Sequence, residues 1–420
     1  MTRKLHCRFI VAATALALLG AACGGDSVAD DAGGTGGGDS VTVYSSLPLQ
    51  GASRPIGEAL ANGMALAFEQ AGHTAGGVQI EYVSLDDSTA QAGAWTPEAE
   101  SANARRAIQD SSAVAYLGTF NSGAAAIAIP LLNEGGMAML SPGNTAVGLT
   151  SEEPGADAEA GEPHIYYPTG ERNYARIVPK DTVQGAALAT IMSEDGCTRA
   201  AILHDKEVYG AGLAANIELA ASELDVPVVR NEGIDGRSAN HRSVASALAA
   251  DGVDCFVFSG ITANGAVQLY KDVAAALPVA ALYGPDGVAE STFYDPADGG
   301  LPPEVAARVK VTVATLSPDE YSEEGRQFFA DYEAAYGDPD PNPYAIYGYE
   351  AASLILDVLD RADDPTDRAS VLRTLFETTD RESVLGTYSI DEHGDTTLTS
   401  YGVYRIDAGR LAFERSVESS

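Results

Sequence analysis

Short apolar runs alternate along this chain with longer segments in which apolar residues recur every three or four positions. The short runs predict β-strands, and the longer segments, such as residues 56–68, predict helices with one buried face. Strands separated by helices are typical of parallel sheets. An acidic stretch rich in Gly and Pro at residues 150–167 interrupts this rhythm, and we interpret it as an exposed loop. The alternation resumes at Thr182, so the pattern predicts two parallel α/β sheets in two lobes.

Two polar turns, at residues 119–123 and 141–145, each follow a short apolar strand of the first predicted sheet. In open α/β sheets, turns at the carboxyl ends of strands are where ligands bind. Small hydroxyl and amide side chains beside the free N–H groups of a helix start favour an anion such as a carboxylate. The residues expected to contact the ligand here are Asn121, Ser122, Asn144 and Thr145. The last two can equally serve to cap the next helix.

The second predicted sheet has different chemistry at its strand ends. Tyr209 follows one strand, a turn at Gly260 follows another, and Asp286 lies in a Gly-Pro-Asp-Gly turn after a third. A wall of neutral donors opposite a carboxylate suits an amino acid, whose ammonium Asp286 would hold through a charge-assisted hydrogen bond. Tyr209 can instead be core packing and Asp286 a plain turn residue. Arg54, in the loop after the first strand, can reach the cleft as a carboxylate partner or remain solvated.

The C-terminal part of the chain departs from this simple alternation. Residues 309–315 predict a further connecting strand. The helices expected after it span residues 322–336, 344–360 and 365–378. A hairpin is expected from residues 386–391 and 399–407, turned at a Glu-His-Gly-Asp segment. Because a hairpin after several helices continues neither sheet, we expect the chain to cross between the lobes more than once.

The first residues are typical of a secretory signal, which we assign to residues 1–22. A basic start is followed by an apolar run at residues 9–19, too short to span a bilayer, and by small residues before Cys23. The cysteine at the cleavage point resembles a bacterial lipoprotein signal, which predicts a lipid on Cys23. That pattern usually has Leu three positions before the cysteine, where this chain has Gly20, so ordinary cleavage and release is the alternative. Residues 23–40 predict a flexible tether of Gly, Ser and Asp, and we expect no later membrane span.

The charge balance and the missing motifs exclude several function classes. The chain has 25 basic and 60 acidic residues, a formal net charge of −35, which argues against binding to nucleic acid or to anionic lipid. The sequence contains no phosphate-binding loop, nucleophile elbow or metal-ligand spacing, so we expect no enzyme activity, no metal and no cofactor. Ser122, His204 and Asp205 resemble a catalytic triad in residue type only, since they fall in different predicted lobes.

Two cysteines remain once Cys7 leaves with the signal and Cys23 is set aside as the anchor. Cys197 and Cys255 each precede an apolar strand, and an exported protein meets oxidising conditions in which such a pair can bond. If the two strands are neighbours, the sulfurs can meet and form a disulfide that contributes about 4 kcal/mol in the chain-entropy relation. If they are not, both cysteines remain buried free thiols.

Four segments together make the mature chain resemble the leucine/isoleucine/valine-binding family of periplasmic solute receptors. They are Asp86-Asp87, Leu140-Ser141-Pro142-Gly143-Asn144-Thr145, Ile202-Leu203-His204-Asp205-Lys206 with Tyr209-Gly210, and Gly284-Pro285-Asp286-Gly287-Val288. The resemblance implies the type I periplasmic binding protein fold, which is α/β: two doubly wound lobes with parallel sheets, joined by three crossover strands around a ligand cleft. Lobe 1 would comprise residues 41–174 plus 316–384, and lobe 2 residues 175–315 plus 385–420. The family's sheet order would also place the two strands that follow the cysteine pair side by side.

The resemblance also implies roles for individual residues. In the family, a serine and a threonine after the third and fourth strands take the ligand carboxylate, and these match Ser122 and Thr145. A cleft-lining tyrosine matches Tyr209, and an acid that takes the ammonium matches Asp286, which is one methylene shorter than the family's glutamate. Where the family tends to have aromatic residues this chain has Ile261, so the pocket for the ligand side chain differs and leucine itself is not implied.

The function implied by the resemblance is that of an extracytoplasmic solute-binding protein, monomeric and not an enzyme. It would close its cleft on an amino acid or a similar small zwitterionic or carboxylate ligand and deliver it to the permease of an ABC importer. Its place would be the outer face of the cytoplasmic membrane, where the lipid on Cys23 holds it. A ligand-sensing receptor or regulator domain of the same fold is the alternative, and a hydrolase is a remote one.

Overall fold

The computed structural model describes residues 39–418 of the 420-residue chain. The predicted signal at residues 1–22, the predicted lipidation site Cys23 and nearly all of the predicted tether lie outside the described residues. Within the described range, none of the helices combines the length and the apolar character that crossing a membrane requires.

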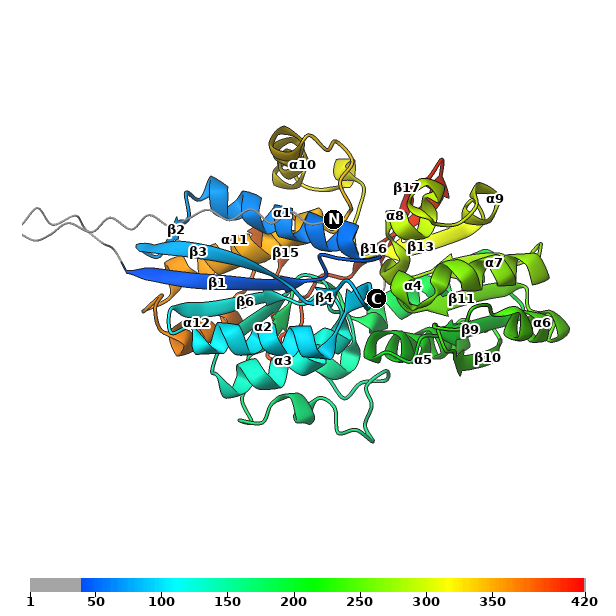
Figure 1. The fold of residues 1–420 in the computed structure, drawn as a ribbon, viewed down its shortest axis with the longest axis horizontal. Coiled ribbons are helices and arrows are strands. Elements are labelled where there is room, and N and C mark those ends of the chain that lie inside the picture. The colour runs from blue at the N-terminus through cyan, green and yellow to red at the C-terminus, as the bar shows by residue number, and fades with distance from the viewer. Residues whose placement is uncertain (1–38, 419–420) are drawn as a thin grey trace, which may run out of the picture. The chain divides into compact units, whose positions relative to one another are not determined.

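The first lobe is built on a six-stranded sheet, in the order β2 (Thr74–Ala75), β3 (Val78–Asp86), β1 (Ser40–Leu47), β6 (Ala113–Gly118), β7 (Ala138–Ser141) and β8 (Tyr174–Arg176). All neighbouring strands in it are parallel except β2 and β3. Helix α1 (Arg54–Gln70) lies on one face, and α2 (Pro97–Gln109) and α3 (Ser122–Glu134) lie on the other (Figure 1). The short strands β4 (Ser88–Thr89) and β5 (Ala94–Trp95) form a ribbon before α2. The apolar period that predicted α1 describes its buried face, since Ile56, Leu60, Met64 and Phe68 are all 0% exposed.

The second lobe is built on a seven-stranded sheet, in the order β10 (Val228–Gly233), β9 (Ala200–His204), β11 (Cys255–Ser259), β12 (Ala281–Gly284), β13 (Val309–Val313), β16 (Ser400–Asp407) and β17 (Arg410–Glu418). Its first five strands are parallel, and β16 and β17 are antiparallel to their neighbours. The long helices of this lobe are α4 (Asp181–Glu194), α5 (Val208–Glu223), α6 (Arg242–Ala250) and α7 (Ala266–Ala276). The short helices α8 (Ser291–Tyr294) and α9 (Pro303–Ala306) follow β12. Figure 1 shows α5 on one face of the sheet and α7 on the other.

The chain passes between the two sheets three times, which confirms the predicted two-lobe α/β architecture. It leaves the first sheet after β8, returns after β13, and enters the second sheet again at β16. Between the last two crossings it forms α10 (Glu323–Tyr336), α11 (Ala345–Arg361) and α12 (Arg368–Phe376). Helix α11 packs so closely on α1 that a Cβ on Gly348 would lie 2.1 Å from the carbonyl oxygen of Leu60. These helices therefore complete the first lobe.

The hairpin predicted from residues 386–391 and 399–407 is wrong. Strand β15 (Gly386–Tyr388) pairs instead with β14 (Arg381–Ser383), and β16 pairs with β17. The isolated bridge between Ile390 and Thr396, within residues 39–418, ends before the second predicted strand begins and does not join the two.

Buried side chains and one tight turn decide this pairing. Arg381 and Tyr388 each donate a 2.7 Å hydrogen bond to Oε1 of Glu350, a buried residue of α11. These bonds hold the β14–β15 ribbon on the first lobe. Strands β16 and β17 are joined by Ala408 and Gly409, whose φ angles of 48° and 77° are those of a type I′ turn, the turn that favours two-residue hairpins.

The disulfide between Cys197 and Cys255 joins the starts of two neighbouring strands of the second sheet. β9 and β11 lie side by side and parallel, and the two Cα atoms are 5.8 Å apart. The bond spans a sequence separation of 58 residues, for which chain entropy gives about 4 kcal/mol of stabilisation.

Candidate functional site

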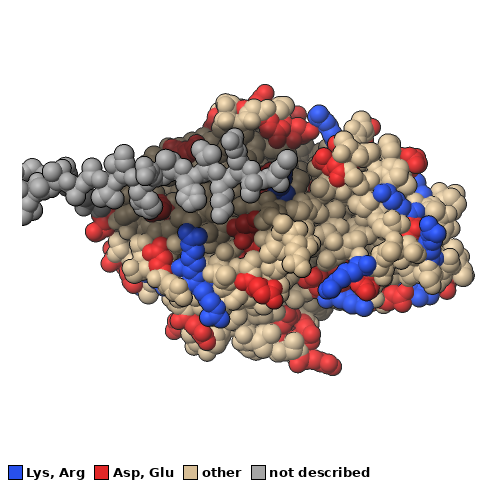
Figure 2. All heavy atoms as spheres, in the orientation of Figure 1, with Lys and Arg blue, Asp and Glu red and all other residues tan. Residues whose placement is uncertain are grey.

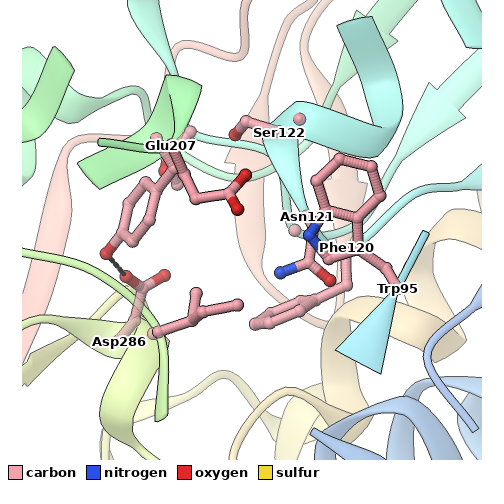
Figure 3. A pocket seen from close by; sticks show the side chains of 12 residues that line it. Trp95, Phe120, Asn121, Ser122, Glu207 and Asp286 are labelled. Carbon is pink, nitrogen blue, oxygen red and sulfur yellow. Dashed lines mark hydrogen bonds between the residues drawn. The ribbon is translucent and has the colours of Figure 1, made fainter. Parts of the chain in front are cut away.

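A cavity lies between the two lobes, bordered by the loops that follow the carboxyl ends of the strands (Figure 3). The cavity volume is only about 20 Å³, so the two walls stand close together. The lining residues are Trp95, Phe120, Asn121, Ser122, Gly123, Gly143 and Thr145 from the first lobe and Glu207, Tyr209, Ile261, Asp286 and Gly287 from the second.

The first-lobe wall is the start of helix α3. Asn121 is the N-cap residue, but its side chain makes no capping hydrogen bond, and its Oδ1 atom has no partner within residues 39–418. The Oγ atom of Ser122 accepts a 3.3 Å hydrogen bond from the backbone N–H of Ala146, and Thr145 lies on the same wall. The first N–H groups of a helix have no acceptor within the helix and carry partial positive charge. This wall therefore favours a negatively charged or hydrogen-bond-accepting group.

Asn144, predicted as a ligand contact or a helix cap, lies behind this wall instead. It is fully buried, and its Nδ2 atom donates to the carbonyl oxygen of Phe120 at 2.9 Å and to Oγ1 of Thr119 at 3.2 Å. Its Oδ1 atom accepts a 3.3 Å hydrogen bond from the hydroxyl of Tyr174. With both ends of its amide used inside the lobe, Asn144 ties the two polar turns together and is not one of the lining residues.

The second-lobe wall is centred on Asp286, which is 3% exposed. Its Oδ1 atom accepts hydrogen bonds from the hydroxyl of Tyr209 at 2.5 Å and from Nε2 of Gln184 at 2.9 Å. Its Oδ2 atom accepts one from the hydroxyl of Tyr344. Burial raises the pKa of Asp286, and these three hydrogen bonds act in the opposite direction. Because Tyr344 directly precedes α11 and its ring packs edge-on against Phe120, its bond to Asp286 links the two lobes.

Two further buried carboxyl groups lie near Asp286. Asp181, the first residue of α4, is 0% exposed, and its burial raises its pKa well above the usual value, with a further contribution from the charge of Asp286. Burial likewise raises the pKa of Glu290 to about 8. Burying a carboxylate without a compensating charge is unfavourable. The second-lobe wall therefore favours a cationic group.

Six lining residues were not predicted as ligand contacts: three are glycines, and the other three are Trp95, Phe120 and Glu207. A Cβ placed on Gly123 would lie 2.5 Å from Cζ2 of the Trp95 ring and 3.1 Å from Oε2 of Glu207, so both side chains reach the start of α3. Figure 3 shows the carboxylate of Glu207 turned into the cavity. Phe120 and Glu207 lie in polar loops that follow strands, and this position could have identified them as ligand contacts. Trp95 lies on the β4–β5 ribbon, where the sequence pattern contains no such signal.

Arg54 lies away from the cavity, contrary to the predicted role as a carboxylate partner. It is the first residue of α1, and its side chain is 60% exposed. Its guanidinium pairs with Glu58, one turn further along the exposed face of the helix, at 3.5 Å. This pairing keeps the charge of Arg54 in solvent.

The triad-like residues do not form a catalytic arrangement. The carboxylate of Asp205 accepts hydrogen bonds from the backbone N–H groups of Glu207 at 3.0 Å and Ile261 at 3.1 Å. It therefore holds two second-lobe loops in place. Among the described residues, no hydrogen bond joins it to His204, and Ser122 lies on the opposite wall.

Comparison with known proteins connects this architecture with characterised relatives. A family model described as periplasmic binding protein matches residues 40–410. An amino acid binding protein of Pseudomonas aeruginosa is 25% identical over 368 residues, which are 86% of this chain and 88% of that protein.

Two solved structures share the fold. A leucine binding protein, LivK, from Thermotoga maritima has a TM-score of 0.74 at 22% identity, covering 90% of this chain and 99% of that one. The solute binding protein of an ABC transporter from R. palustris, in complex with benzoate, has a TM-score of 0.71 at 22% identity, covering 90% of this chain and 98% of that one. At this identity the likeness concerns the fold alone. Since one of these proteins is named for an amino acid and the other holds an aromatic acid, the fold does not identify the ligand.

Proposed function

Because the chain belongs to the periplasmic binding protein family, we propose that it binds a small ligand between its lobes and delivers it to an ABC importer. The ligand class we propose is an amino acid, or a closely related compound that carries an ammonium group. One observation carries this proposal: the start of α3, with Ser122 and Thr145, lies across the cavity from the buried carboxyl group of Asp286. The first wall suits a carboxylate and the second an ammonium.

Closure of the two lobes on the ligand is the mechanism that this arrangement supports. The hydrogen bond from Tyr344 to Asp286 joins the lobes, and rotation of the lobes about the three crossings would break it and open both walls to solvent. A ligand that bridges the walls would favour the closed form, which an importer can distinguish from the open one.

The proposal includes export and attachment to the outer face of the cytoplasmic membrane through a lipid on Cys23. The basic, apolar and small-residue segments that precede this cysteine support it. Fractionation of cells that express the full chain tests it. The native protein should sediment with membranes and Cys23→Ser should not, whereas a native protein found wholly in the released fraction contradicts the anchor.

Thermal unfolding with a ligand panel tests the binding role. Amino acids, their amides and small carboxylic acids should include at least one compound that raises the melting temperature, since a ligand at one hundred times its Kd stabilises by about 2.7 kcal/mol. Asp286→Asn should abolish that shift, and Asp319→Asn, an exposed carboxylate on a short helical turn, should not. A panel without any stabilising compound contradicts the binding role. Undiminished binding by Asp286→Asn contradicts the ammonium site alone.

A further inference from the structure

The charges that line the cavity are unbalanced. Among the described residues that border it, Glu207 and Asp286 carry carboxyl groups, and none is Lys, Arg or His. Arg176, a fully buried cation of the first lobe, donates to Asp395 at 2.7 Å and to the carbonyl oxygen of Ala146 at 2.7 Å, so its charge is compensated within the lobe. A zwitterionic ligand adds no net charge and leaves this excess of negative charge in place.

Asp286, which also lacks a cationic partner, is held by three side-chain hydrogen bonds, so the carboxyl group left for a second cation is that of Glu207. It immediately precedes α5 and points into the space between the walls (Figure 3). Its neighbour Lys206 is directed elsewhere, because a Cβ on Gly233 would lie 2.6 Å from Cγ of that lysine. Within residues 39–418, Glu207 takes part in no ion pair. Burial raises the pKa of Glu207, and the negative charge of Asp205 raises it further. This direction is expected for a carboxyl group that has no cation nearby.

Other lining groups suit a cation with several N–H donors. Asn121 is 7% exposed, and its unpartnered Oδ1 atom belongs to a side chain on the cavity wall. Trp95 and Phe120 supply aromatic rings, whose faces attract cations. These groups supplement the two carboxyl groups of the cavity with an acceptor and with apolar contact surface.

Building on the proposed function, we infer that the ligand is a net cation, an amine with a second positive group beyond the ammonium at Asp286, and that Glu207 binds that second group. Amino acids with a basic side chain and aliphatic diamines belong to this class, whereas leucine and benzoate do not. The surface of the protein favours the same class at long range. Asp and Glu outnumber Lys and Arg by 60 to 25, and Figure 2 shows the acidic residues spread over the visible face. This excess of negative charge attracts cations toward the protein.

Calorimetric titration of the full chain with L-lysine, 1,5-diaminopentane, L-leucine, L-glutamate and benzoate at equal ionic strength tests this inference. The first two compounds should bind and the last two should not. Glu207→Gln should weaken the binding of lysine about tenfold or more, as expected for the loss of a hydrogen bond between charged groups. Glu223→Gln, which removes an exposed carboxylate at the far end of α5, should leave lysine binding unchanged.

The variants and the panel separate this inference from the proposed function. The side chain of Glu207 makes no capping hydrogen bond at the start of α5, so its replacement should leave the unfolding curve intact. If leucine or benzoate binds more tightly than lysine, or if Glu207→Gln binds lysine as well as the native chain does, the inference is wrong. The proposed function survives that outcome when the preferred compound carries an ammonium group and Asp286→Asn abolishes its binding. If no amine or amino acid binds at all, both fail.

Discussion

A buried glutamate in the first lobe predicts that the folded chain loses stability as the pH rises. Glu100, on α2, is 0% exposed and accepts hydrogen bonds from Oγ of Ser46 at 2.5 Å and from the hydroxyl of Tyr116 at 2.7 Å. Burial raises its pKa from 4.5 to about 8. Burial, and then the charge of Glu100, also raise the pKa of the adjacent Asp87 well above its usual value. The folded state therefore keeps a proton that the unfolded chain has already lost above pH 5.

The size of this effect follows from the width of the pH interval. A group with a raised pKa in the folded state stabilises it fully below the unfolded pKa, and that stabilisation is lost as the pH rises through the folded pKa. Each pH unit between the two values costs about 1.4 kcal/mol for one proton. From pH 5.5 to 7.5, Glu100 alone should lower the free energy of unfolding by about 2.7 kcal/mol. Glu100→Gln carries no titrating proton and should remove this part of the slope.

Urea unfolding followed by circular dichroism at several pH values between 5.5 and 8.5 measures the slope. The slopes of the native chain and Glu100→Gln should differ by about 1.4 kcal/mol per pH unit up to pH 7.5, and the comparison cancels the contributions of titrating groups that do not interact with Glu100. Glu98→Gln, an exposed carboxylate in the first turn of the same helix, is the matched control and should keep the native slope. Equal slopes for the native chain and Glu100→Gln would show that Glu100 is ionised in the folded protein and refute the reasoning.

Three further predictions concern the two lobes. Replacing both Cys197 and Cys255 by Ser should lower the free energy of unfolding by about 4 kcal/mol in urea without reductant, and an unchanged value would contradict the chain-entropy argument. Gly348→Ala should lower the free energy of unfolding by about 1–3 kcal/mol, because the new Cβ would stand 2.1 Å from the carbonyl oxygen of Leu60. Since Ala otherwise favours helices over Gly, a stabilised variant would disprove this contact. Arg54→Ala should leave ligand affinity within about twofold in calorimetry, since only an exposed i, i+4 ion pair is lost, and a larger loss would place Arg54 at the site.

Local sequence patterns predicted those parts of the fold that depend on neighbouring residues. The helix expected at residues 344–360 is α11, and the polar turns after β6 and β7 border the cavity. The hairpin failed because its pairing depends on Glu350, which is remote in sequence and binds both Arg381 and Tyr388. Alternation of apolar residues records which face of a strand is buried, but it does not record which strand lies beside it.

The same limit applies to the site. Asn144 and Thr145 are adjacent polar residues that the local sequence does not distinguish as ligand contacts. In the structure, Asn144 donates a hydrogen bond to the carbonyl oxygen of Phe120, whereas Thr145 borders the cavity. Only the packing of the two turns separates them. Trp95 reaches the site from a ribbon without any chemical motif, so no reasoning from spacing selects it.

The hydrogen bonds of Asp286 suggest why closure and ligand chemistry belong together. A carboxylate has about four acceptor positions, and Tyr209, Gln184 and Tyr344 occupy three of them. Because the backbone N–H of Gly287 also contributes a hydrogen bond to this carboxyl group, Asp286 alone cannot satisfy a ligand ammonium, which has three N–H donors. The unpartnered oxygen of Asn121 lies on the other lobe, so an ammonium is satisfied by both walls only when they stand close together. Glu207 takes no part in these hydrogen bonds and remains available for a second cation, so a ligand that carries one gains an additional contact from closure.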